Sequence, residues 1–133
     1  MLPTQRIAQI CLFLFAAIAI FGGTLQMYLG EPDTTPRLDN IHRFLAGVYL
    51  ACGLICFWAA WTVQQQNTLV FLIALAGIFG ATGRLISMSK VGLPEPSTPW
   101  IIYILVELVV PLIIVISQMI TNKKLKARHK AIR

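Results

Sequence analysis

Charged side chains are scarce in this sequence of 133 residues, where they make up 12% of the chain. Ordinary globular proteins carry roughly 25%, and their surface helices show a polar stripe opposite the apolar one. Here residues 69–81 contain no polar side chain at all, which excludes a soluble helical bundle. A hydrophobic fraction of 57% likewise excludes a disordered chain or a coiled coil.

Motifs for common chemistry are also missing. The chain has no phosphate-binding loop, dinucleotide fingerprint, zinc-spaced ligand set or nucleophile elbow. The two histidines, His42 and His129, lie far apart in the sequence. The three cysteines include Cys52 and Cys56, one helical turn apart and poorly placed for a disulfide, and we interpret all three, with Cys11, as small apolar fillers. The sequence therefore predicts no metal, no cofactor and no catalytic residue.

What the chain does have is a series of long apolar runs, each near the ~20 residues that a helix needs to cross a bilayer core. We expect membrane-spanning helices at residues 7–29, 41–63, 69–88 and 100–120. The first run resembles a signal peptide, but it continues to Leu29, which is too long for a signal core, so we expect it to be retained. The predicted fold class is all-α, a bundle of four transmembrane helices over residues 1–121, followed by a basic cytoplasmic tail at 122–133.

The net charge of +6 lies in that tail, since residues 122–133 hold six basic side chains and the remaining residues sum to zero. A tail of this kind is typical of a cytoplasmic anchor that attracts anionic lipid, and we expect no nucleic-acid partner. With Arg6, seven basic residues flank one side of the membrane, against Arg37 and Lys90 on the other. The asymmetry predicts that both termini are cytoplasmic and that the proline-rich loops at 30–39 and 89–99 lie outside.

Capping residues give provisional helix starts. Asp39 or Asn40 is expected to cap the second helix, and Thr98 followed by Pro99 is typical of a cap and first turn for the fourth. The glycines at positions 77, 80 and 83 predict close helix packing along the third helix.

Three ionisable residues fall inside the predicted spans: Arg43, Arg84 and Glu107. Each costs about 2.5–3.5 kcal/mol at a helix centre, so such residues are candidates for function. At 1.5 Å per residue they lie about 5, 6 and 10 Å inside the same outer face. Three polar groups at one level predict a single cluster.

Helical spacing adds polar neighbours to these charges. The candidate ligand-binding residues are Asn40, His42, Arg43, Tyr49, Arg84, Tyr103 and Glu107. Two arginines and one glutamate leave the cluster with an excess positive charge, and a buried excess charge requires a counter-ion. A phospholipid phosphate, a fatty-acid carboxylate or Asp39 would each supply it.

Three functions remain open from the residues. The cluster forms an outward-facing pocket for a lipid headgroup or other amphiphile, or it fixes helix packing in an accessory membrane subunit. The third function, proton-coupled transport or a lipid-modifying enzyme with Glu107 as acid or base, has no nucleophile or metal to support it. Besides membrane lipids, which we expect to be anionic or fatty-acid-like, the partners left open are a second copy of the chain and an envelope protein.

Motifs on three of the predicted helices carry a resemblance to a known family. They are Asn40-x-x-Arg43-Phe44-x-x-Gly47-x-Tyr49, Gly83-Arg84-Leu85-x-Ser87 and Glu107-Leu108-x-x-Pro111. In this region, residues 40–111, the chain resembles a bacterial family of small four-helix inner-membrane proteins of unknown function. That family includes AciT-like proteins, which are connected with the permeability barrier of the cell envelope. The resemblance implies a multi-pass protein of the bacterial inner membrane with an envelope role, and it brings no catalytic residue.

Overall fold

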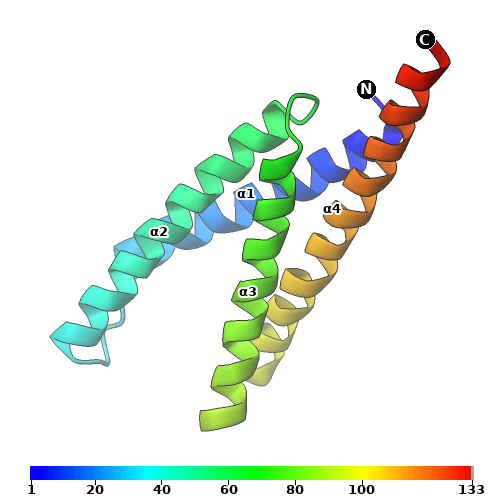
Figure 1. Ribbon diagram of the computed structural model, residues 1–133. Helices are drawn as coiled ribbons and strands as arrows, with labels where there is room; N and C mark the ends of the chain where they lie inside the picture. Colours follow the sequence, from blue (N-terminus) through cyan, green and yellow to red (C-terminus); the bar gives the residue numbers. More distant parts are fainter. Residues whose placement is uncertain (133) are drawn as a thin grey trace. The chain divides into compact units, whose positions relative to one another are not determined.

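A computed structural model describes residues 1–132, which form four α-helices and contain no β-strand. The helices are α1 (Pro3–Leu29), α2 (Pro36–Trp61), α3 (Thr68–Val91) and α4 (Ser97–Ile132) (Figure 1). Each is long and apolar enough to cross a membrane. The all-helical fold class predicted from the sequence is therefore confirmed, and the four spans indicate a multi-pass membrane protein.

The chain divides into two compact units. The first-hairpin unit, Leu12–Thr62, contains most of α1 and all of α2, whereas the second-hairpin unit combines Met1–Cys11 with α3, α4 and the α2–α3 turn. The predicted site residues are divided between the two units: Asn40, His42, Arg43 and Tyr49 belong to the first-hairpin unit, and Arg84, Tyr103 and Glu107 belong to the second-hairpin unit.

The start of α2 corrects the predicted cap. Thr35 is the N-cap residue, its Oγ1 accepts a hydrogen bond from the Leu38 backbone N at 3.3 Å, and Pro36 takes the first helical position. Asp39 and Asn40, the predicted caps, lie inside the helix. The polar run before residue 41 is helical because a threonine–proline pair already provides the start signal.

The fourth helix differs from its predicted range at both ends. It begins at Ser97, so Thr98 and Pro99 lie within its first turn, and it continues through the predicted tail to Ile132. The tail is helical because it lacks glycine and proline and is rich in lysine, arginine, alanine and leucine, which are good helix formers. Its 36 residues span about 54 Å, well beyond the ~30 Å hydrocarbon core. The basic segment is therefore a rigid extension of the last span.

Glycines bring α1 and α2 into backbone contact. A Cβ added at Gly23 would lie 2.7 Å from the Leu50 backbone N, and one at Gly53 would lie 2.8 Å from the Ile20 backbone N. Small residues allow transmembrane helices to approach in this way. The predicted close packing along α3 is not found at Gly83, where a Cβ would meet nothing within 4 Å.

One end of the second-hairpin unit holds an uncharged polar layer. Thr4 Oγ1 and Thr121 Oγ1 are 2.6 Å apart and join the first turn of α1 to α4. Gln118, only 3% exposed, donates from Nε2 to Asn67 Oδ1 at 3.1 Å and so joins α4 to the residue before α3. The layer fixes the N-terminus and the α2–α3 turn at the level where the basic segment of α4 begins.

Candidate functional site

Arg43 closes the first helical hairpin. Its Nε donates to Asp39 Oδ2 at 2.9 Å, one turn earlier on α2, and its Nη1 donates to the backbone carbonyls of Met27 and Tyr28. The last carbonyls of a helix have no partner within the helix, so a cation there is stabilising both as a donor and against the helix dipole. Arg43 therefore caps the C-terminus of α1.

The same contact fixes the α1–α2 turn. Gly30 has a φ of +65°, and a Cβ there would overlap both the Arg43 guanidinium and Asp39 Oδ1. Asp39 Oδ1 also accepts a hydrogen bond from the Glu31 backbone N at 2.8 Å. We call this arrangement of Gly30, Asp39 and Arg43 the turn clamp, and its contacts are those of a structural element.

Arg84 has a different environment in the second-hairpin unit. Its Nε donates to both oxygens of Glu107, at 3.1 Å to Oε1 and 2.9 Å to Oε2. The pair joins α3 to α4, and the Arg84 and Glu107 side chains remain 34% and 17% exposed. Pro111 leaves the Glu107 carbonyl without its usual helical donor, but both hydrogen bonds from Arg84 go to the carboxylate.

Two aromatic rings hold the Arg84 guanidinium in place. Its central carbon lies 5.9 Å from the centroid of Trp100 and 5.4 Å from that of Tyr103, within the range of cation–π attraction. The two rings pack edge to face, with centroids 5.9 Å apart. We call Arg84, Trp100, Tyr103 and Glu107 the Arg84 site.

One edge of this guanidinium is open. Among the described residues, Nη1 and Nη2 of Arg84 form no hydrogen bond, because both bonds to Glu107 come from Nε. Arginine carries five N–H donors in a rigid fork, so the four on Nη1 and Nη2 are without a hydrogen-bond acceptor among the described residues. This edge can bind two oxygens of one phosphate or carboxylate group.

The ion pairs change the charge balance expected from the sequence. Asp39 neutralises Arg43 and Glu107 neutralises Arg84, so each pair sums to zero. The excess positive charge that argued for an anionic ligand is therefore compensated by Asp39, one of the three counter-ions considered. The Arg84 site remains attractive for a ligand because of its open donor edge, not because of a net charge.

The other predicted site residues lie in the first-hairpin unit. Asn40 is exposed, His42 is half-buried, and Tyr49 lies across from Gly22, where an added Cβ would be 3.4 Å from its ring. The structure thus brings Arg84, Tyr103 and Glu107 together, while the hydrogen bonds of Arg43 to described residues go to Asp39 and to the last turn of α1.

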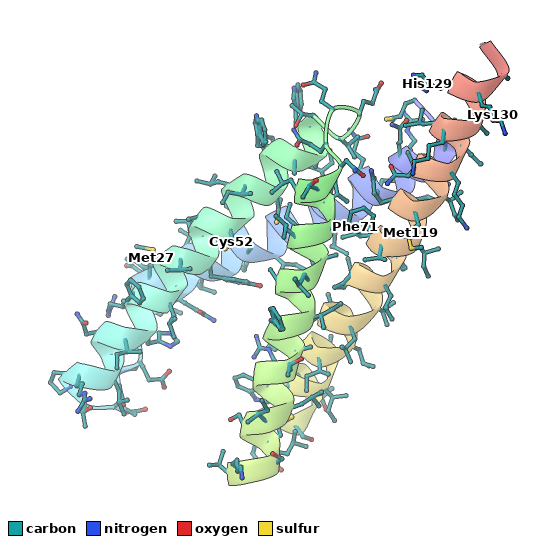
Figure 2. All side chains as sticks on the ribbon, in the orientation of Figure 1. Met27, Cys52, Phe71, Met119, His129 and Lys130 are labelled. Atoms are coloured by element: carbon teal, nitrogen blue, oxygen red, sulfur yellow. The ribbon has the colours of Figure 1, made fainter. Side chains whose placement is uncertain are left out.

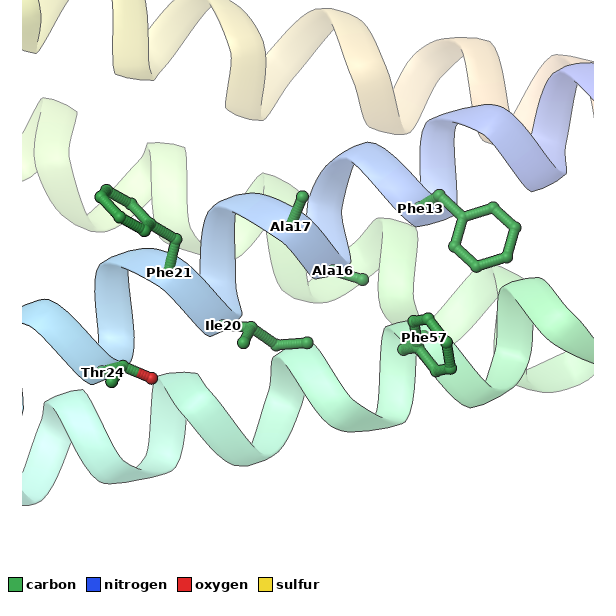
Figure 3. A pocket seen from close by; sticks show the side chains of 7 residues that line it. All are labelled: Phe13, Ala16, Ala17, Ile20, Phe21, Thr24 and Phe57. Carbon is green, nitrogen blue, oxygen red and sulfur yellow. The ribbon is translucent and has the colours of Figure 1, made fainter.

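An apolar groove of about 500 Å³ lies on the first-hairpin unit (Figure 3). Its lining consists of Phe13, Ala16, Ala17, Ile20, Phe21 and Thr24 from α1, with Phe57 from α2. Thr24 supplies the only side-chain hydroxyl in this lining, so the groove has no group that would recognise a charged headgroup.

A comparison with protein families decides the family of the chain. A family model described as a domain of unknown function, DUF4345, matches residues 7–118. The chain belongs to the DUF4345 family. No curated protein and no solved structure matched it. The DUF4345 match includes the turn clamp and the Arg84 site, and it ends before the basic segment of α4.

The sequence indicated part of this site and missed part. Trp100 is not among the candidate residues from the sequence, because its contact with Arg84 depends on the pairing of α3 with α4. Outside this site, the sequence analysis also missed Gln118 of the polar layer, although an amide inside a predicted span was a usable signal. Its Oε1 is buried without a hydrogen-bond partner among the described residues.

Proposed function

We propose that this DUF4345 protein is a non-catalytic protein of the bacterial inner membrane whose Arg84 site binds a phospholipid headgroup through its phosphate. The observation that carries the proposal is the open edge of Arg84, whose Nη1 and Nη2 have no hydrogen-bond partner in the part of the chain that the structure describes, while Nε donates to Glu107. A guanidinium fork matches a phosphate because two parallel N–H donors meet two oxygens.

The position of the site supports a lipid ligand. Arg84 lies seven residues before the end of α3 at Val91, which corresponds to about 10 Å along the helix. Trp100 and Tyr103 sit near the start of α4, at the depth where aromatic side chains meet lipid headgroups. A phosphate at this level would bind Arg84 while the acyl chains stay in the hydrocarbon core.

The wider role follows from the resemblance to AciT-like proteins. We propose that headgroup binding supports maintenance of the envelope permeability barrier, with both termini in the cytoplasm and the Arg84 site facing outward. The open donor edge and the absence of a nucleophile motif support binding rather than catalysis.

Thermal unfolding in detergent, with and without added phospholipid, tests headgroup binding. A ligand that binds only the folded state raises its stability by about 2.7 kcal/mol at a hundredfold excess over Kd. We expect the wild type to gain Tm with phospholipid and Arg84→Gln to lose that gain. Because Arg84→Gln leaves Glu107 unpaired, the double variant Arg84→Gln/Glu107→Gln should be measured beside it, and it should also fail to respond.

Arg43→Gln is the matched control, since it removes the other intramembrane arginine. We expect it to lower the Tm without lipid, because the α1 carbonyls lose their donor, and to keep the full Tm gain with lipid. An equal lipid response in the wild type and in both Arg84 variants would contradict headgroup binding.

A structural accessory role is the second candidate. It is favoured by the turn clamp, in which Arg43 serves only the fold, and by the Arg84–Glu107 pair, which also ties α3 to α4. In that case Arg84→Gln would lower the Tm by the same amount with and without lipid, and the neutral double variant would recover part of the loss.

A further inference from the structure

We infer that the phospholipid bound at the Arg84 site is zwitterionic, with a primary ammonium group beside its phosphate, as in phosphatidylethanolamine. The inference rests on the proposed headgroup function and names the class of headgroup. It follows from the pairing of one partly exposed cation on α3 with one partly exposed carboxylate on α4.

The charges of the site match a zwitterion. Arg84 and Glu107 form a neutral pair, so a headgroup with a net negative charge would bring one anion more than the site compensates. A phosphate on the open edge of Arg84 would also lie next to the Glu107 carboxylate and be repelled by it. A ligand that carries its own cation removes this repulsion.

Glu107 can accept that cation. Each of its oxygens accepts one hydrogen bond from Arg84 Nε, and a carboxylate offers about four acceptor positions. The Glu107 side chain is 17% exposed and the Arg84 side chain is 34% exposed, so both members of the pair remain accessible. An ammonium group on the short ethanolamine spacer would then bind Glu107 while the phosphate binds Arg84.

The hydrogen-bonding capacity of the carboxylate fits the same assignment. Gly80 lies beside Glu107, where an added Cβ would be 3.7 Å from Oε2, and it places no side chain against the carboxylate. A primary ammonium donates three N–H groups to such acceptors. A quaternary ammonium donates none, so Glu107 favours ethanolamine over choline headgroups.

The test measures lipid affinity of the full chain in detergent, by thermal shift and by native mass spectrometry. Phosphatidylethanolamine, phosphatidylcholine and phosphatidylglycerol with identical acyl chains are titrated separately, with soluble phosphoethanolamine as a fourth probe. We expect the wild type to bind phosphatidylethanolamine about tenfold more tightly than the other two lipids, a difference of about 1.4 kcal/mol. Soluble phosphoethanolamine should bind much more weakly, because it has no acyl chains.

Glu107→Gln is the decisive variant, because glutamine keeps the shape and a hydrogen-bond acceptor but removes the charge. We expect its preference to reverse, with phosphatidylglycerol bound more tightly than phosphatidylethanolamine, since Arg84 is then an unneutralised cation. Asp39→Asn removes a carboxylate from the turn clamp and should leave the preference of the wild type unchanged.

The outcomes separate the two proposals. Wild type that binds phosphatidylglycerol or phosphatidylcholine as tightly as phosphatidylethanolamine, with binding lost in Arg84→Gln, would overturn the zwitterion inference and leave headgroup binding intact. Soluble phosphoethanolamine that binds as tightly as the lipid would overturn a phospholipid as the ligand. An unchanged preference in Glu107→Gln would overturn the zwitterion inference. No response to any lipid would instead overturn the proposed function itself.

Discussion

Two arginines of this protein show how surroundings decide what one residue type does. Arg43 directs its Nε to Asp39 and its Nη1 to the last carbonyls of α1, so its donors complete a turn. Arg84 donates to Glu107 through Nε alone, and its Nη1 and Nη2 have no hydrogen-bond partner among the described residues. The first arrangement stabilises the fold, and the second leaves binding capacity.

The turn clamp predicts a large effect for a small change at Gly30. Gly30→Ala places a side chain at φ +65°, which costs about 1–2 kcal/mol for an L-residue, and its Cβ would also overlap Arg43 and Asp39. We expect a fall in Tm greater than that of Gly92→Ala. Gly92 has a φ of +90° but no atom within 4 Å of an added Cβ, so this control carries backbone strain without the overlap.

Circular dichroism melts of both variants in the same detergent would give the comparison. Equal falls in Tm for the two substitutions would mean that the contact of Gly30 with Arg43 contributes nothing to stability.

At this scale the sequence could predict the Arg84 site but not the function of Arg43. Helix depth placed Arg84 and Glu107 at one level, and antiparallel neighbours bring such residues together. Arg43 had a similar predicted depth, but it donates to backbone carbonyls of α1. A pattern of side chains in the sequence does not predict such a contact with the backbone. The sequence could have predicted the ion pair of Arg43 with Asp39, because the two residues are one turn apart on the same helix.

The packing of α1 against α2 depends on glycine residues. Membrane helices gain little from hydrophobic burial against each other, so close backbone approach and dispersion contacts supply their association. Gly23 and Gly53 provide this approach from opposite helices, each against the backbone of the other.

Gly53→Ala should therefore separate α1 from α2. Overpacking of this kind costs about 1–3 kcal/mol, and the clash with the Ile20 backbone cannot be relieved by a side-chain rotation. Gly83→Ala is the control on α3, because its new methyl meets no atom within 4 Å and helix propensity favours alanine by about 1 kcal/mol. We expect a clear loss of Tm for Gly53→Ala and no loss for Gly83→Ala, and a loss of equal size in both would refute close packing at Gly53.

The number and type of the helices could be predicted from apolar runs, whereas their ends could not. Hydropathy registers only the part of a helix that lies in hydrocarbon. The Thr35 cap and the lysine-rich end of α4 lie outside it, so the predicted ranges of α2 and α4 were too short. The glycines at positions 77, 80 and 83 likewise predicted close packing along α3, which is not found at Gly83. Spacing along one helix does not reveal which glycine faces a neighbouring helix.

For the whole molecule, the remaining question is its orientation in the membrane. Within the second-hairpin unit, the bond between Thr4 and Thr121 places the N-terminal turn of α1 beside the start of the basic segment of α4. Gln118 ties the α2–α3 turn to the same level through Asn67. His129 and Lys130 project near the end of α4 (Figure 2), and Trp100 and Arg84 lie toward the opposite end of the α3–α4 pair.

Among the described residues, this arrangement places six basic residues at one end of the second-hairpin unit: Arg6, Lys123, Lys124, Lys126, Arg128 and Lys130. Basic residues near span ends are retained in the cytoplasm, so we expect that end to be inside and the Arg84 end to be outside.

Single cysteines in a background without Cys11, Cys52 and Cys56 would measure this orientation. In intact bacterial cells, an impermeant maleimide should label Leu93→Cys, in the loop before α4, and should label Ala127→Cys only after the inner membrane is permeabilised. Leu75→Cys, within the α3 span, is the control that should stay unlabelled in both conditions. Labelling of Ala127→Cys in intact cells, with Leu93→Cys protected, would place the Arg84 site in the cytoplasmic leaflet. A lipid bound at the Arg84 site would then come from the cytoplasmic leaflet of the inner membrane. This result would contradict the proposal that the Arg84 site faces outward.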